Sequence, residues 1–173
     1  MQPTKEGDTV TLSVGSKVMY PSQGPCLIGA VVNKEVAGSQ MSFYRLALLD
    51  DSGGELFVPV GKAEGVGLRP LLNRSEIPKL LGHLMKTGQI DNDWKQRARD
   101  NSKLLTSGSA FDLAEVVESL TELNERKPLS FRESQVLERA KRLLVCEISE
   151  VLDLTKSAAE EQINQALKAP KEV

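Results

Sequence analysis

The chain has 173 residues, of which 40% are hydrophobic and 27% charged, a composition typical of globular proteins and not of disordered chains. Its 22 basic and 24 acidic residues give a formal net charge of −2. This charge excludes a protein coated in basic residues, such as a nonspecific condenser of DNA. Any contact with nucleic acid must therefore be local, and the length allows two compact modules.

The sequence offers little for catalysis or for binding a cofactor. Cys26 and Cys146 lie far apart without a CxxC pair, and His83 is the single histidine, so we expect two buried thiols and neither a disulfide nor a metal site. The glycines from 61 to 67 do not form a phosphate-binding loop. We therefore expect no enzyme, no cofactor and no small-molecule substrate.

The termini and the apolar runs indicate where the protein acts. The longest apolar runs span only a few residues, and the N-terminal residues contain neither a basic segment nor an apolar one that would form a signal peptide. We expect a cytoplasmic protein without a membrane partner.

The first module, residues 1–73, has the pattern of a β domain. Short apolar and β-branched runs alternate with segments rich in glycine, proline and aspartate, which predicts strands joined by tight turns. The strands are expected within residues 17–20, 27–32, 43–49 and 55–60. Such strands form a small, bent antiparallel sheet or half-barrel, whose open edges make strand addition to a partner's sheet physically easy.

The second module, residues 74–173, has the pattern of a compact all-α bundle of about five helices. Its apolar residues recur at helical spacing, and capping residues precede each run. The helices are predicted to begin near Ser75, Asp93, Ser109, Ser130 and Ser157. Gly108 is expected to end the second helix, and the short first helix is expected to bridge the modules. The fold class is therefore α+β.

Two basic strips are predicted on the helices. The strip on the second helix contains Lys95, Arg99 and Lys103, with Arg97 beside Trp94. The strip on the fourth helix contains Arg132, Arg139 and Arg142, away from the apolar face. Arginine and lysine strips suit the phosphates of a duplex, but a solvated face has the same pattern.

Trp94, the only tryptophan, allows two interpretations. It can pack into the bundle, as a single tryptophan usually does. However, positions 97, 98 and 101 are Arg, Ala and Asn, so no apolar stripe begins at Trp94. The alternative is an aromatic wedge that enters the minor groove where base stacking is disturbed. The sequence by itself leaves both interpretations open.

Taken in order, several segments make the whole chain recognisable. The N-terminal ones are Val14-Gly15-Ser16-Lys17-Val18-Met19-Tyr20-Pro21-Ser22-Gln23-Gly24, Phe57-Val58-Pro59-Val60 and Val66-Gly67-Leu68-Arg69. The C-terminal ones are Trp94-Lys95-Gln96-Arg97-Ala98-Arg99, Thr106-Ser107-Gly108-Ser109, Ala114-Glu115-Val116-Val117, Leu129-Ser130-Phe131-Arg132-Glu133 and Ala140-Lys141-Arg142-Leu143-Leu144. In this order and spacing, the chain resembles the bacterial CarD/CdnL family of transcription regulators.

The resemblance implies a Tudor-like N-terminal domain that docks on the β subunit of RNA polymerase, and a helical domain that contacts promoter DNA. Trp94 would be the wedge at the upstream edge of the −10 region and would stabilise the open complex. The residues implied to face DNA are Trp94, Lys95, Arg97, Arg99, Lys103, Arg132, Arg139 and Arg142. Those implied to face the polymerase are Lys34, Val36, Phe57, Val58 and Pro59. We expect a monomer with these two partners.

The chain also departs from the family pattern. Phe57 stands where several relatives have a basic residue, so Lys34 is the basic side chain kept on this surface, and Gln96 and Ala98 replace basic or aromatic residues of the wedge motif. A second hypothesis is therefore an adaptor that binds the polymerase while its helices bind no DNA. Exposure of Trp94 favours the regulator, and burial favours the adaptor.

Overall fold

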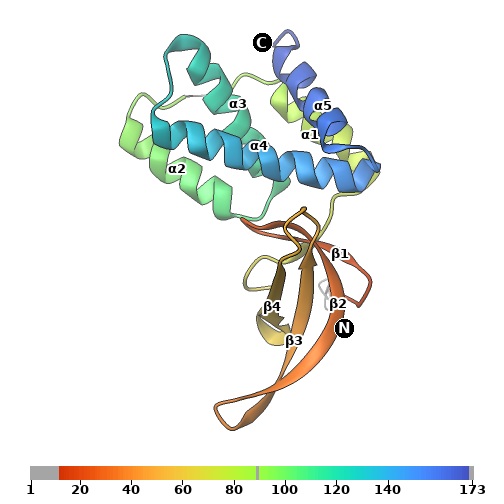
Figure 1. Ribbon diagram of the computed structural model, residues 1–173. Helices are drawn as coiled ribbons and strands as arrows, with labels where there is room; N and C mark the ends of the chain where they lie inside the picture. The colour runs from red at the N-terminus through yellow and green to blue at the C-terminus, as the bar shows by residue number, and fades with distance from the viewer. Residues whose placement is uncertain (1–11, 89, 172–173) are drawn as a thin grey trace, which may run out of the picture.

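The computed structural model describes residues 12–88 and 90–171 of the chain. Within these residues a five-stranded antiparallel sheet comes first and five α-helices follow it (Figure 1). The predicted α+β class, a small antiparallel sheet followed by a helical bundle, is confirmed.

The sheet has the strand order β4-β3-β2-β1-β5. Its strands are β1 (Lys17–Tyr20), β2 (Gly24–Val36), β3 (Ser39–Leu48), β4 (Glu55–Pro59) and β5 (Arg69–Pro70). A single 3₁₀ turn, η1 (Val60–Lys62), follows β4. The outer strands are thus β4 and β5. The sequence pattern predicted β4 but not the two-residue β5.

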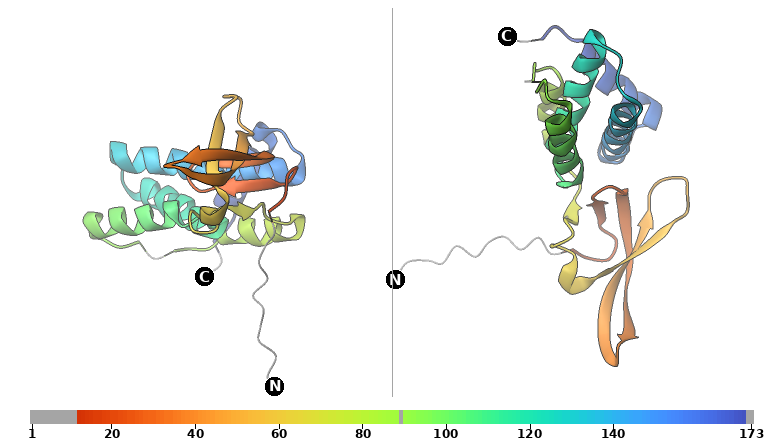
Figure 2. Two further views of the ribbon diagram at one scale, coloured as in Figure 1. Left: turned by 90° about the horizontal axis from the view of Figure 1, so that it is seen from below. Right: turned by 90° about the vertical axis from the view of Figure 1, so that its left-hand side faces the viewer.

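Strands β2 and β3 form a long hairpin that extends away from the helices (Figures 1 and 2). Its two-residue turn consists of Ala37 and Gly38, with φ of 50° and 82°, as a type I′ hairpin turn requires. Both strands are longer than their apolar runs, because polar residues such as Asn33 and Ser42 pair in the solvent-exposed half. Strand propensity does not detect such residues.

The helices are α1 (Ile77–Leu84), α2 (Trp94–Thr106), α3 (Ala110–Arg126), α4 (Phe131–Leu152) and α5 (Lys156–Lys168). Three predicted caps are confirmed: Asp93, Ser109 and Ser130 each accept a backbone N–H in the first turn of the helix that follows. Gly108 follows α2 with φ of +87°, as expected for a glycine just past a helix.

The first helix differs from its prediction. A 3₁₀ turn, η2 (Arg74–Glu76), precedes it, and Asn73 caps that turn in place of Ser75. Helix α1 also ends at Leu84, four residues before Gly88. Its apolar face is buried in the helical core, so α1 is part of the bundle and does not bridge the modules.

The hydrophobic residues form two cores. Val18, Cys26, Ile28, Leu46 and Val58 are among the buried residues inside the sheet. The larger core lies between the helices and also contains Met19 from β1. Helix α4 runs across the end of the sheet at β1 (Figure 1), and its Leu143 packs against Gly24 of β2. The two domains are therefore in direct contact.

Candidate nucleic-acid and polymerase interfaces

Trp94 is exposed at the first position of α2. Asp93 caps this helix by accepting the backbone N–H of Lys95 at 3.0 Å, which fixes where the helix begins. The buried residues of α2 are Arg97 and Asn101 rather than apolar residues, so no apolar stripe of this helix begins at the indole. Its exposed fraction is 62%, and the interpretation of Trp94 as a core residue is excluded.

The resemblance implies that Arg97 faces DNA beside Trp94, but its guanidinium points into the protein. Its side chain is buried, at 8% exposure. Its Nη1 donates to the backbone oxygens of Asp91 and Asn92, at 2.9 and 3.2 Å. Its Nη2 lies 3.5 Å from Oε1 of Glu133 on α4. Arg97 therefore holds the segment before Trp94 and joins the first turns of α2 and α4.

The other cations of the first strip are exposed. Nζ of Lys95 lies 5.6 Å from the ring centroid of Trp94, within the range of a cation–π contact. Arg99 donates to Oε1 of Gln96 at 2.8 Å, and Lys103 lies one turn farther along the same helix. These side chains leave three positive charges at the surface of α2.

A groove between α2 and α4, here called the basic groove, brings the two predicted strips together. It has a volume of about 690 Å³. Arg99 and Lys103 line it from α2, and Arg132 lines it from α4. Its apolar wall contains Ala98, Leu105 and Val136, and Glu133 is its acidic residue. Three cationic side chains from two helices thus border one surface.

Arg139 and Arg142 lie apart from the basic groove. They line a separate hollow on α4 together with Gln135 and Glu138, and Arg139 donates to the backbone oxygen of Ser22 at 3.2 Å. The fourth-helix strip is therefore divided, with Arg132 at the groove and these two arginines toward the sheet.

The positive charges near the sheet affect Asp50. Its carboxyl pKa is lowered chiefly by hydrogen bonds from Ser52, and then by the charges of Lys156 and Arg142. This carboxylate is fully exposed in a turn, so Arg142 of α4 and Lys156 of α5 have a negative neighbour in the sheet domain.

The residues implied to face the polymerase differ in exposure. Phe57 and Val36 are exposed, at 44% and 43%, and Val36 ends β2 at the hairpin turn. Val58 is buried, at 2%, and pairs with Tyr44 of β3, so the implied direct contact of its side chain with a partner is not supported. Pro59 is half-buried and pairs with Phe43. Lys34 places Nζ 3.9 Å from the centroid of the Phe57 ring.

Strand β4 leaves one edge of the sheet open. Among the described residues it pairs with β3 and with no other strand. Its backbone N–H and C=O groups on the far side are therefore free to pair with a strand of another protein. The exposed ring of Phe57 lies on this same strand.

Sequence reasoning missed two features. Phe131, the first residue of α4, is 79% exposed. Its position outside the apolar stripe of that helix could have predicted this exposure. Glu147 is fully buried. The sequence feature that could have revealed this burial is its place on the apolar face of α4, between Leu144 and Ile148. It pairs with Arg69 across the domain contact.

The two cysteines differ in burial. Cys26 is buried and Cys146 is half-buried, and both are free thiols. No cluster of three or more His, Cys, Asp or Glu that could hold a metal ion is found in residues 12–88 and 90–171. In the same ranges no helix is long and apolar enough to cross a membrane.

Comparison with known proteins gives matches to both halves of the chain. Residues 12–72 match the family model described as CarD-like/TRCF RID domain. Residues 79–164 match the model described as CarD, C-terminal domain.

Two individual proteins are also similar. A candidate transcription factor of Bacillus subtilis strain 168, YdeB, is 26% identical over 152 residues, covering 87% of this chain and 95% of YdeB. The solution NMR structure of the 72-residue N-terminal domain of Myxococcus xanthus CarD is 37% identical. It covers 40% of this chain and 93% of that domain, with a TM-score of 0.30.

Proposed function

We propose, from the premise that this chain belongs to the CarD/CdnL family of RNA polymerase-interacting transcription regulators, that it stabilises the open promoter complex. In this proposal the sheet docks on the β subunit of the polymerase. Trp94 then enters the minor groove of promoter DNA at the upstream edge of the −10 region. We propose that it acts as a monomer, in the cytoplasm, without an enzymatic step.

The open edge of β4 supports the docking part. An unpaired strand edge can add to a partner's sheet through main-chain hydrogen bonds, while neighbouring side chains supply specificity. Phe57 offers exposed apolar surface on this strand, and Lys34 adds a positive charge directly over its ring. Val36 extends this surface along the hairpin. Val58 is buried, so we assign it a supporting role inside β4, and the half-buried Pro59 lies next to it at the end of the strand.

The exposure of Trp94 is the observation that carries the DNA part. An indole that is 62% exposed at a helix start costs solvation free energy unless a partner covers it. Such an apolar wedge binds best where a base step is already unstacked. Because it binds distorted DNA more tightly than intact duplex, it shifts the equilibrium from closed to open complex.

The cations around Trp94 would supply phosphate contacts. Lys95 lies beside the indole, and Arg99, Lys103 and Arg132 border the basic groove. Arg139 and Arg142 would reach phosphates farther along the duplex, toward the sheet. Arg97 is buried under the segment before Trp94, so we assign it a supporting role: it holds the first turn of α2 that presents the indole.

The test is the lifetime of the open complex on a promoter template, with purified polymerase and with or without this protein. We expect the protein to lengthen the lifetime and Trp94→Ala to abolish the effect. The variant should keep its affinity for polymerase, and its free energy of unfolding should change by less than about 0.5 kcal/mol, because the residue is exposed.

Phe57→Ala is the matched control, since it also removes an exposed aromatic ring but in the other domain. We expect it to weaken polymerase binding. At a saturating concentration of the variant, the open-complex lifetime should still be lengthened as much as by the wild-type protein. If wild-type protein binds polymerase without changing the lifetime, the adaptor is the correct function.

A further inference from the structure

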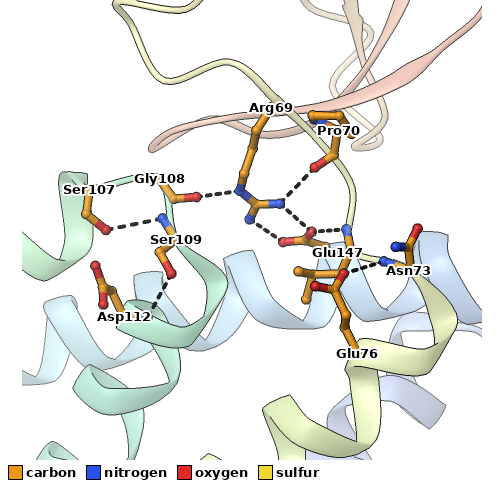
Figure 3. Close-up of polar contacts among 10 residues, drawn as sticks. Arg69, Pro70, Asn73, Glu76, Ser107, Gly108, Ser109, Asp112 and Glu147 are labelled. Carbon is orange, nitrogen blue, oxygen red and sulfur yellow. Dashed lines mark hydrogen bonds and ion pairs between the residues drawn. The ribbon is translucent and has the colours of Figure 1, made fainter. Parts of the chain in front are cut away.

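Arg69 and Glu147 form an ion pair across the contact between the two domains (Figure 3). The two residues are 78 positions apart in the chain. Nη1 of Arg69 donates to Oε2 of Glu147 at 2.8 Å, and Nη2 donates to Oε1 at 2.7 Å. This is the two-point geometry in which a guanidinium fixes the orientation of a carboxylate as well as its position.

The same two side chains make further bonds to the backbone. Arg69 donates from Nε to the oxygen of Gly108 and from Nη1 to that of Pro70. Oε2 of Glu147 accepts the N–H of Leu72 at 3.0 Å, in the segment that connects the domains. The buried carboxylate is therefore fully bonded, which a charge at 0% exposure requires.

Gly108 makes this arrangement relevant to Trp94. It lies just past the end of α2, and Trp94 begins that helix. Through Gly108 and Glu147, Arg69 thus holds both α2 and α4, the two helices that form the basic groove.

Two glycines and a proline bring the backbones together at the same place. Gly67 and Gly108 have φ of +84° and +87°. A Cβ added to Gly67 would lie 3.0 Å from Cγ of Pro21, and one added to Gly108 would lie 3.3 Å from it. The three segments that meet here leave no room for even a methyl group without movement.

The other polar contacts between the domains are more exposed. In the Lys17–Glu150 pair the side chains are 48% and 26% exposed, and Lys156 lies 3.8 Å from the fully exposed Asp51. Ion pairs of this kind contribute little and are screened by salt. Among the ion pairs between the domains in the described residues, Arg69–Glu147 has the least exposed side chains, at 23% and 0%, so it is the pair best able to fix an orientation.

We propose that Arg69 is a positioning residue: its ion pair with Glu147 fixes the orientation of the helical domain on the sheet. Trp94 is thereby held at a set position relative to β4. The inference rests on the proposed function, in which β4 contacts polymerase while Trp94 contacts DNA. A flexible connection would spread Trp94 over many positions, and the fraction of docked protein that reaches the DNA correctly would fall.

The first readout is the relative orientation of the domains in the full chain, measured by residual dipolar couplings. In wild-type protein we expect both domains to fit one alignment tensor. In Arg69→Met, which keeps a long side chain but removes the charge and the donors, we expect two different tensors. Arg69→Lys keeps the charge, so the tensors of its two domains should differ less than those of Arg69→Met. Lys17→Met, which breaks the exposed pair across the same contact, is the matched control and should behave as wild type.

The second readout is the lifetime of the open complex at saturating protein. We expect Arg69→Met to lose most of the lifetime effect while its affinity for polymerase changes less than about twofold. Arg69→Lys should recover part of the effect, and Lys17→Met all of it. A merely structural residue would not separate lifetime from polymerase affinity in this way.

Arg69→Met leaves the Glu147 charge buried without its counter-ion and can therefore unfold the protein. The double variant Arg69→Met/Glu147→Leu removes both charges, and such replacements are often neutral in stability. It should fold, show two tensors and lose the lifetime effect. A common tensor in the folded variants, an unchanged lifetime despite two tensors, or loss of folding in both variants would each overturn the proposal.

Failure of the proposed function has a different signature. If wild-type protein does not lengthen the lifetime, the function is wrong whatever the variants do. The dipolar couplings would still report whether Arg69 fixes the orientation of the domains.

Discussion

Lys34 places its ammonium nitrogen 3.9 Å from the centroid of the Phe57 ring. The residues lie on β2 and β4, with β3 between them, so the contact spans three strands of the sheet. The ring stays 44% exposed, and the cation adds a charge to an apolar contact surface. The aromatic ring on β4 thus holds a lysine of β2 across the intervening strand.

Phe57→Ala should weaken polymerase binding by about 1–2 kcal/mol, or roughly 5- to 30-fold in Kd. The substitution removes the exposed ring and its cation–π contact with Lys34. Lys34→Glu should weaken the binding as well, by reversing the charge at the same place. Binding of labelled protein to purified polymerase measures both changes. Lys79→Glu, the same charge change on the exposed face of α1, is the control. Unchanged affinity in both variants would remove this surface from the interface.

Gly67→Ala should lower the free energy of unfolding by roughly 1–2 kcal/mol. A non-glycine residue is strained at φ of +84°, and the new methyl would lie 3.0 Å from Cγ of Pro21. Gly61→Ala is the control, since nothing lies within 4 Å of its added Cβ. Urea unfolding followed by circular dichroism gives both values, and equal stability of the two variants would contradict the argument.

Glu118 should make stability depend on pH. Burial raises its pKa above the ordinary 4.5, against the lowering effect of the Lys171 ammonium, which lies 3.1 Å from Oε1. Between the ordinary and the raised pKa the folded state binds more protons than the unfolded state. The contribution of Glu118 to the free energy of unfolding therefore falls as pH rises through that interval.

Glu118→Gln cannot ionise and should lose this contribution. Relative to wild type, its free energy of unfolding should increase, meaning a relatively more stable variant, as pH rises from about 4.5 toward neutrality. Urea titrations at several pH values measure the difference. Glu125→Gln, which makes the same substitution on the exposed side of the same helix, is the matched control. A pH-independent difference for Glu118→Gln would show that its pKa is not raised in the folded protein.

Cys26 should resist thiol reagents in the folded protein. Burial, and to a lesser degree the charge of Asp50, raise the pKa of its thiol to about 12, so almost no thiolate exists near neutral pH. Cys146 is half-buried and its pKa is raised less, so it should react first and serves as the internal control. Mass spectrometry after pulses of N-ethylmaleimide separates the two sites. Cys26 should react only in denaturant, and equal rates in the folded state would contradict its burial.

Local signals in the sequence determined the helices and most of the strands. Asp93, Ser109 and Ser130 cap helices where their spacing predicted, because a capping side chain bonds to the backbone two or three residues away. The apolar pattern did not predict strand where polar residues pair across two strands, as in the solvent-exposed half of the β2–β3 hairpin. It also failed at α1, because the 3₁₀ turn capped by Asn73 displaced the start of the helix.

The order of motifs along the chain identified the family, and the position of Trp94 at a helix start followed from Asp93. The sequence could not decide whether the indole is buried, since burial depends on what packs against it. Helical spacing placed Arg97 beside Trp94, yet only the tertiary structure decided that its guanidinium turns inward to Asp91, Asn92 and Glu133. The partnership of Arg69 with Glu147 was likewise beyond the sequence, because two residues 78 positions apart meet only when the domains pack together.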